Sequence, residues 1–401
     1  MKANVLVLGC TLVAYGLAAG PAVAQKVYDP GASDTVIKIG NTVSYSGPAS
    51  AYGTLGKADA AYFEMINANG GVNGRRIEFI SRDDAFSPPK TVEQTRRLVE
   101  EDRVLFMFNS LGTAPNSAVQ KYLNAAKVPQ LFIAAGGRKF TDIENFPWTM
   151  AFQPNFHIEA KIYARFILNN YPDAKIAVLY QGDDLGKDYL TGLKDGLGER
   201  ARSMIVGEAA YLITDATIDS QMVSLRATGA NVFFSATTPK FAAQALRKAA
   251  EMGWKPVHIL TAGVNSVGAV LRPAGLENAI GAISATASKD VTDPKWHDDP
   301  GYLAWAAWMK KYYPEGDMSD ALNAGAYTVS ETIVQVLKQA GDNLTRANIM
   351  KQALNLDFKP TMTLPGVRVK TSPTQSAPLT SMQLERFDGK KWELFGDVVG
   401  Q

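Results

Sequence analysis

VLFMFNSLGTAPNSAVQKYLNAAKVPQLFIA, residues 104–134, contains the pattern that decides the fold. It opens with an uninterrupted apolar run, Val104 to Phe108, and continues through a loop of small and hydroxyl-bearing residues. A helix-like segment at 114–126 follows, and then a second apolar run at 130–134. Short apolar strands that alternate with amphipathic helices are typical of βαβ units. Because these strands lack polar alternation, we expect helices to cover both faces of a parallel sheet.

The same alternation continues along the chain in both directions. Strand-like segments lie at 36–43 and 76–82, with helix-like segments at 51–69 and 89–101. After Pro154 a second series begins, in which helix-like and strand-like segments alternate from 157 to 261. Two series, each too long for one compact sheet, predict an α/β protein with two Rossmann-like lobes, each built on a parallel central sheet.

Connections between the lobes can be placed from the same pattern. Residues 145–154 and Ile280–Ser288 are predicted to cross from one lobe to the other. The helix-like segments after the second crossing, between 302 and 355, are then expected to return to the first lobe. Near the C-terminus, Asp388-Gly389 stands between two runs of alternating polarity, which predicts a β-hairpin.

Composition narrows the possible functions. The chain has 401 residues, which suggests two to three domains, and 46% hydrophobic with 20% charged residues is typical of a globular protein. Lys+Arg number 41 against 39 Asp+Glu, and this balance argues against a nucleic-acid binder. A single Cys excludes an intrachain disulfide or a Cys-based metal centre, and the three His match no metal-ligand spacing. We therefore expect neither a metal nor a cofactor.

The N-terminus has the features of a secretory signal peptide. Lys2 precedes an apolar stretch at 5–19, and Ala22-Val23-Ala24 ends it. Cleavage after Ala24 would give a mature protein that begins at Gln25, most simply in a bacterial periplasm. Two alternatives remain open: a lipid-modified Cys10, for which the preceding apolar segment is short, and a retained anchor, for which the stretch is shorter than the usual span of about 20 residues.

Catalytic motifs are missing from the sequence. It contains neither the G-x-S-x-G nor the G-x-x-x-x-G-K-[ST] pattern. The acidic pairs Asp83-Asp84 and Asp183-Asp184 follow strands, where a carboxylate more often caps a helix or closes a turn than performs catalysis. The protein is therefore not expected to be an enzyme.

Loops at the predicted carboxyl ends of strands are the candidate binding site. Three of them, at 44–53, 109–115 and 134–138, are rich in small and hydroxyl residues. Ligands of open α/β sheets bind at these strand ends, and free N–H groups at helix N-termini suit a carboxylate. Arg138 could add a charged hydrogen bond. Alternatively, the loops form only turns and caps, and Arg138 is simply solvated.

Several motifs make the chain resemble a known family, the periplasmic leucine/isoleucine/valine-binding proteins, which are type I substrate-binding proteins of ABC importers. The motifs are Ser46-Gly47-Pro48, Gly70-Gly71-Val72-Asn73-Gly74-Arg75, Arg82-Asp83-Asp84 and Arg386-Phe387-Asp388-Gly389. The resemblance implies two lobes joined by three crossings, the third near Phe358–Met362. It also implies closure over a ligand and delivery to membrane permease subunits with cytoplasmic ATPases. Lobe 1 would comprise residues 25–147 and 287–358, and lobe 2 residues 148–286 and 359–401.

The resemblance also assigns ligand-binding positions. It places two carboxylate loops and the positions around them on Tyr52, Ser110, Leu111, Gly112, Thr113, Ala135, Gly136, Gly137, Leu185, Thr237 and Thr238. The acid that holds a ligand ammonium falls on Val264 or Asn265, and neither residue is acidic. Because a buried ammonium without a counter-charge is costly, we expect a carboxylate ligand without an α-ammonium. Alternatively, an acid from another loop holds a ligand ammonium. For the function, the alternative to import is a ligand sensor that acts on a signalling receptor.

Overall fold

The first series of apolar segments forms a parallel sheet with the order β3-β2-β4-β5-β6 in the computed structural model, which describes residues 26–400. The predicted signal peptide, residues 1–24, lies outside the described residues. The strands of this sheet are β2 (Val36–Val43), β3 (Arg76–Asp83), β4 (Phe106–Phe108), β5 (Gln130–Ile133) and β6 (Thr149–Ala151). All residues of β4 and β5 are buried, as expected for strands that helices cover on both faces.

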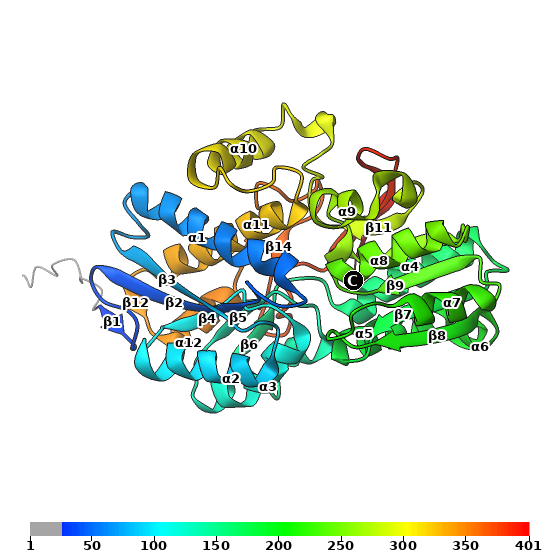
Figure 1. Ribbon diagram of the computed structural model, residues 1–401. Helices are drawn as coiled ribbons and strands as arrows, with labels where there is room; N and C mark the ends of the chain where they lie inside the picture. The colour runs from blue at the N-terminus through cyan, green and yellow to red at the C-terminus, as the bar shows by residue number, and fades with distance from the viewer. Residues whose placement is uncertain (1–25, 401) are drawn as a thin grey trace, which may run out of the picture.

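Helices cover both faces of this first sheet (Figure 1). The helices of this lobe are α1 (Gly53–Ala68), α2 (Pro88–Arg96), α3 (Thr113–Ala125), α10 (Pro300–Tyr312), α11 (Ala321–Ala340) and α12 (Arg346–Ala353), and α10 packs on the outside of α1. α1 and α11 pack together on one face, and α2 and α3 on the other. Tyr327 of α11 packs between Tyr62 of α1 and Trp308 of α10, with ring centroids 4.9 and 5.1 Å apart. The helices that follow residue 300 thus complete the core of the first lobe, as predicted.

The second series forms a sheet of seven strands with the order β16-β15-β11-β10-β9-β7-β8. Its strands are β7 (Ile176–Gln181), β8 (Ile205–Tyr211), β9 (Val232–Ala236), β10 (Val257–Leu260), β11 (Ile283–Thr286), β15 (Ser381–Phe387) and β16 (Trp392–Gly400). β7 to β11 pair in parallel, whereas β15 and β16 pair antiparallel. The hairpin predicted at Asp388-Gly389 is therefore confirmed, since this dipeptide joins β15 to β16.

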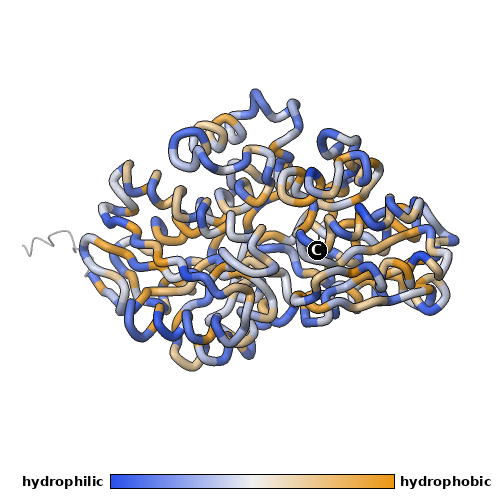
Figure 2. The backbone as a smooth tube through the Cα atoms, in the orientation of Figure 1, coloured by the Kyte–Doolittle hydropathy of each residue, from blue (hydrophilic) through white to orange (hydrophobic). Residues whose placement is uncertain are grey.

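The helices of the second lobe are α4 (Phe156–Asn170), α5 (Asp184–Leu197), α6 (Ala201–Met204), α7 (Asp219–Ala227), α8 (Pro239–Glu251) and α9 (Arg272–Ala274). α4 and α5 contribute to one apolar cluster against the sheet, and α7 and α8 to another. Hydrophobic residues follow the strands inside both lobes, while hydrophilic residues lie on the outer turns of the helices (Figure 2). The cluster formed by α4 and α5 also takes in Ile133 and Ala151 of the first sheet, so the two cores meet at this side of the molecule.

The crossings lie at sheet boundaries that differ in part from the prediction. β6 still pairs with β5, so the first crossing begins after Ala151, within the predicted 145–154 but later than the lobe boundary predicted at 148. The second follows β11, within the predicted 280–288. The third was predicted at Phe358–Met362 but occurs after Leu379, because residues 362–379 supply Met362, Leu364 and other buried side chains to the first core.

Short strand pairs tie the chain termini and loops to the first lobe. β1 (Val27–Tyr28) pairs with β12 (Asn343–Leu344), and β13 (Asp357–Phe358) pairs with β14 (Val369–Lys370). The β13–β14 pair folds the segment after α12 back onto the lobe. This pairing delays the third crossing until Ser381, where β15 begins.

Candidate functional site

A cavity of about 190 Å³ lies between the two lobes, at the carboxyl ends of their parallel strands. Residues from the loops after β4, β5, β9 and β10, and from α11, α4 and α5, form its walls. Most of the lining side chains are apolar, including Phe86, Phe152, Phe156, Met382 and Trp392. In each sheet the order of the strands along the chain reverses at one point, between β2 and β4 in the first sheet and between β7 and β9 in the second. Open α/β sheets bind ligands at such points.

Most of the predicted site residues line this cavity. They are Tyr52, Leu111, Gly112, Thr113, Ala135, Leu185, Thr237, Thr238 and Asn265. Ser110, Gly136, Gly137 and Arg138 belong to the same loops but are not among the residues that line the cavity.

The first lobe contributes a helix N-terminus to the cavity. Gly112 precedes α3 with a φ of 91°, and no side chain caps the helix. The first N–H groups of a helix have no acceptor within that helix, and the helix dipole adds positive potential there. The buried Thr113 Oγ1 has no hydrogen-bond partner among the described residues. These donors at the start of α3 suit a ligand carboxylate.

Ser110 and Gly136 shape the loops around α3. Ser110 Oγ accepts a hydrogen bond from the Thr42 amide at 3.3 Å, and the Ser110 carbonyl accepts one from Asn116 Nδ2 at 2.9 Å. A Cβ at Gly136 would lie 2.3 Å from the Pro154 carbonyl oxygen. Gly136 therefore leaves room for the first crossing, and its carbonyl accepts the Phe156 amide at 2.8 Å.

Arg138 takes part in a contact between the lobes. Its side chain is exposed, and its amide donates to Asp188 Oδ2 of α5 at 2.8 Å. The next residue, Lys139, places Nζ 3.0 Å from Asp184 Oδ2. These contacts join the loop after β5 to α5, and the charged hydrogen bond from the Arg138 side chain to a ligand stays a prediction.

The acidic pairs after the strands serve as turns and caps, as predicted. Asp183 accepts the Leu185 amide at 3.0 Å and caps α5. Asp84 accepts the Phe86 amide at 2.9 Å and the Thr91 hydroxyl at 2.8 Å. Asp83 accepts the amides of Tyr45 and Ala85, which closes the loop after β2.

Two buried carboxyl groups in the second lobe also line the cavity, and neither was predicted from the sequence. Glu159 of α4 accepts from the hydroxyls of Tyr163 and Tyr189 at 2.9 and 2.7 Å, and from the Ala262 amide at 2.8 Å. Burial raises the pKa of Glu159 above its usual value, although these three donors act in the opposite direction.

The second carboxyl group belongs to Glu385 on β15, which is 1% exposed. Its Oε1 accepts a hydrogen bond from Asn265 Nδ2 at 2.7 Å. Burial raises the pKa of Glu385 to about 8, with a smaller contribution from the charge of Asp290. Glu385 and Phe387 are two residues apart on β15, so they point to the same face of the sheet, and both are buried. An acid on the apolar face of a strand is the signal by which the sequence could have indicated this residue.

Acids from elsewhere in the chain line the cavity, which is the alternative left open by the non-acidic Val264 and Asn265. Val264 is buried and does not line the cavity. Asn265 does, but its amide is bonded to Glu385, an acid that comes from a strand 120 residues further along the chain. The cavity therefore offers N–H and hydroxyl donors on the first lobe and two carboxyl groups on the second.

Two α/β lobes that exchange the chain through three crossings, with a cavity between their strand ends, define the class of two-lobed ligand receptors. Residues 36–391 match the family described as periplasmic binding protein, and the chain belongs to this family. This is a family of solute-binding proteins, not of enzymes. Leu/Ile/Val-binding protein homolog 7 of Brucella abortus (strain 2308) is 26% identical, with 90% of this chain and 92% of that protein covered.

Solved structures with the same fold confirm the predicted type I architecture. A branched chain amino acid ABC transporter protein from Thermus thermophilus with bound valine gives a TM-score of 0.82 at 16% identity, covering 92% of this chain and 97% of that chain. An ABC transporter solute binding protein from R. palustris, in complex with 4-hydroxybenzoate, gives 0.76 at 18% identity, with 91% and 97% covered.

Proposed function

We propose that this protein is the periplasmic solute receptor of an ABC importer and that it captures a small carboxylate-bearing ligand, either an amino acid or an aromatic or aliphatic acid. The uncapped N-terminus of α3, with the unpartnered Thr113 hydroxyl in the cavity wall, carries this proposal. The closed receptor would deliver its ligand to membrane permease subunits with cytoplasmic ATPases. Removal of residues 1–24 as a signal peptide would leave the exported form.

The apolar walls and their polar ends suit such a ligand. Phe156 and Tyr189 stack with ring centroids 4.6 Å apart, and both line the cavity together with Leu185. An apolar body would bury against these side chains, at about 25 cal/mol per Å² of apolar surface removed from water. The carboxylate at α3 would then fix the orientation of the ligand.

The test is a thermal-shift screen of the exported protein against amino acids and carboxylic acids. Ligands that bind the native state raise its stability by mass action, so at least one carboxylate should raise the melting temperature. Calorimetry and recovery of unmodified ligand then separate a receptor from an enzyme. Stabilisation only by solutes without a carboxylate would contradict the proposed ligand class.

A matched pair of variants locates the carboxylate. Thr113→Val should weaken binding of the stabilising acid about three- to tenfold, because a ligand hydrogen bond contributes about 0.5–1.5 kcal/mol. Thr95→Val is the control, because Thr95 Oγ1 is also buried without a partner but lies in α2, outside the cavity lining. Equal losses in both variants would show that the start of α3 is not the carboxylate site.

The importer role has its own readout. Cells that lack the gene should lose uptake of the labelled acid, and the gene supplied in trans should restore it. Unchanged uptake, with a lost transcriptional or behavioural response to the acid, would indicate a sensor instead.

A further inference from the structure

Glu385 lies where a ligand between the lobes would meet the second sheet. It is on β15, directly opposite Ser284 of β11 on one side and Leu394 of β16 on the other. Its side chain lines the cavity although the residue is 1% exposed. Asn265 Nδ2 donates to Oε1, which leaves Oε2 as the carboxyl oxygen available to a ligand.

The charges around Glu385 do not provide it with a counter-ion. Lys289 lines the same cavity, but its ammonium bonds to Asp299 and to the Thr361 carbonyl. Lys295 pairs with Asp293 at 3.1 Å. Among residues 26–400, no ion pair includes Glu385.

The remaining groups that face Glu385 are acidic or neutral. Asp290, whose carboxyl accepts the Trp392 amide, adds negative potential, and Lys295 offsets it in part. On α4, Tyr163 lies near Glu385, and its hydroxyl is bonded to the Glu159 carboxyl. An ionised Glu385 would therefore be a buried charge beside other acids, a costly arrangement without a cation. Consistent with this, the pKa of Glu385 is raised to about 8 by burial.

We propose that Glu385 acts as an uncharged carboxylic acid that donates a hydrogen bond from Oε2 to an acceptor oxygen of the ligand, so that the receptor prefers carboxylic acids with a 2-oxo group over the matching 2-amino acids. This inference rests on the proposed function, since it assumes that α3 holds the ligand carboxylate. An ammonium has only donors and cannot accept the Oε2 proton, so the carboxyl would have to ionise, against its burial, to act as a counter-charge. A carbonyl oxygen accepts the proton of the acid directly, without a change of charge.

The test uses ligands that share a carbon skeleton and differ only in the substituent on carbon 2. Leucine, 4-methyl-2-oxopentanoate and 4-methylpentanoate form one series, and phenylalanine, phenylpyruvate and 3-phenylpropanoate form another. In calorimetry at neutral pH, a 2-oxo acid should bind the wild-type protein about tenfold or more tightly than its amino acid and its unsubstituted acid.

Two variants separate hydrogen-bond donation from charge. Glu385→Gln keeps an N–H donor and no charge, so it should retain 2-oxo acid affinity within about threefold. Glu385→Leu removes the donor, so the same affinity should fall about tenfold or more. If the Leu variant fails to fold, the Gln variant still decides the proposal, because a large loss of affinity in Glu385→Gln would overturn it.

The pH dependence provides a second readout. As pH rises through about 8, Glu385 ionises, loses its donor and places a negative charge beside an anionic ligand. Wild-type affinity for the 2-oxo acid should therefore fall between neutral pH and about pH 9.5, by about tenfold. Glu385→Gln should show no such fall, and parallel pH profiles of the two proteins would overturn the proposal.

Other outcomes are also decisive. Tighter binding of leucine or phenylalanine than of their 2-oxo acids would make Glu385 a counter-charge and overturn the inference. Absence of binding by both 2-oxo acids would overturn it as well. The proposed function fails separately, namely if no carboxylic acid of any kind stabilises the protein in the thermal screen.

Discussion

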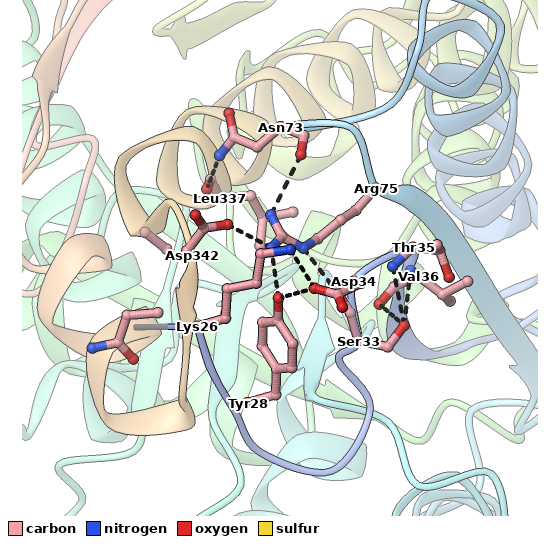
Figure 3. A network of polar contacts seen from close by, with 12 residues as sticks. Lys26, Tyr28, Ser33, Asp34, Thr35, Val36, Asn73, Arg75, Leu337 and Asp342 are labelled. Atoms are coloured by element: carbon pink, nitrogen blue, oxygen red, sulfur yellow. Dashed lines mark hydrogen bonds and ion pairs between the residues drawn. The ribbon is translucent and has the colours of Figure 1, made fainter. Parts of the chain in front are cut away.

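Arg75 shows how one residue of the Gly-Gly-Val-Asn-Gly-Arg motif holds distant segments together (Figure 3). Its side chain is 3% exposed. Nη2 lies 2.6 Å from Asp342 Oδ1 and donates to the Tyr28 hydroxyl at 2.8 Å, and Nε donates to the Ser33 carbonyl at 3.0 Å. The guanidinium thus joins the N-terminal segment to the turn after α11. The motif that carried the family resemblance has a structural role and does not contact the cavity.

Replacing this guanidinium should destabilise the protein. Arg75→Ala leaves the Ser33 carbonyl and the Asp342 carboxylate, whose side chain is 44% exposed, without their donor. We expect a loss of about 1–3 kcal/mol in unfolding free energy. Arg76→Ala is the control, because Arg76 is the adjacent Arg and is exposed, so its loss should stay within about 0.5 kcal/mol. Urea unfolding of both variants measures the difference. Equal midpoints would show that the Arg75 network contributes nothing to stability.

Some residues that line the cavity could be predicted from the sequence, and others could not. Gly112 and Thr113 line the cavity because they lie between a strand and a helix, an arrangement visible in local sequence. Glu385 was missed because periodicity shows which strand face is buried but not what it is buried against. Its partner Asn265 is 120 residues away in the chain, and only the fold brings the two together.

At the scale of the elements, Gly112 determines the position of the first turn of α3. Gly112 has a φ of 91°, and a Cβ there would lie 2.5 Å from the ring of Phe86, a residue that also lines the cavity. A larger residue would push Phe86 and the first turn of α3 apart. The N–H groups that we assign to the ligand carboxylate would then move with that turn.

Gly112→Ala should therefore lower both stability and affinity. The matched control is Gly198→Ala, because Gly198 also has a positive φ, 59°, but has no atoms within 4 Å of the added Cβ. A positive φ alone costs an alanine about 1–2 kcal/mol, so the control isolates that contribution. Thermal unfolding should show a larger loss for Gly112→Ala, and calorimetry should show weaker acid binding for this variant alone. Identical behaviour of the two variants would mean that the Phe86 contact is relieved without moving α3.

The prediction of elements succeeded where periodicity was sustained. The strand predicted at 36–43 is β2, and the helix-like segments predicted between 302 and 355 contain α10, α11 and α12. The third crossing was placed too early because the Pro-, Ser- and Thr-rich segment after residue 359 has no period. Its buried residues, such as Leu364 and Val367, are irregularly spaced, and they reach the first core through the β13–β14 pairing.

On the scale of the whole molecule, polar contacts join the lobes near α11 and near α5. Near α11, the Tyr52 hydroxyl donates to the Gly263 carbonyl at 3.0 Å, and Ser266 Oγ donates to Asp320 Oδ1 at 2.8 Å. Near α5, Lys139 pairs with Asp184. Buried apolar side chains of the first lobe, including Ile133 and Ala151, also pack in the cluster formed by α4 and α5. A ligand in the cavity would add its own contacts to both lobes. We therefore expect a hinge motion of the two lobes, in which the ligand stabilises the closed form.

Tyr52→Phe tests whether the contact between Tyr52 and Gly263 stabilises the closed form. The variant removes this hydrogen bond between the lobes and keeps the aromatic ring in the cavity wall. Saturating carboxylate ligand should reduce the radius of gyration of the wild-type protein in small-angle scattering. The variant should need about three- to tenfold more ligand to reach the same value, because one such bond contributes about 0.5–1.5 kcal/mol to the closed form. Tyr45→Phe is the control, because the Tyr45 hydroxyl bonds to Ser81 Oγ at 2.6 Å within the first lobe. An unchanged radius of gyration at demonstrated saturation would rule out closure between the lobes, whereas equal shifts in both variants would remove the contact between Tyr52 and Gly263 from the closing mechanism.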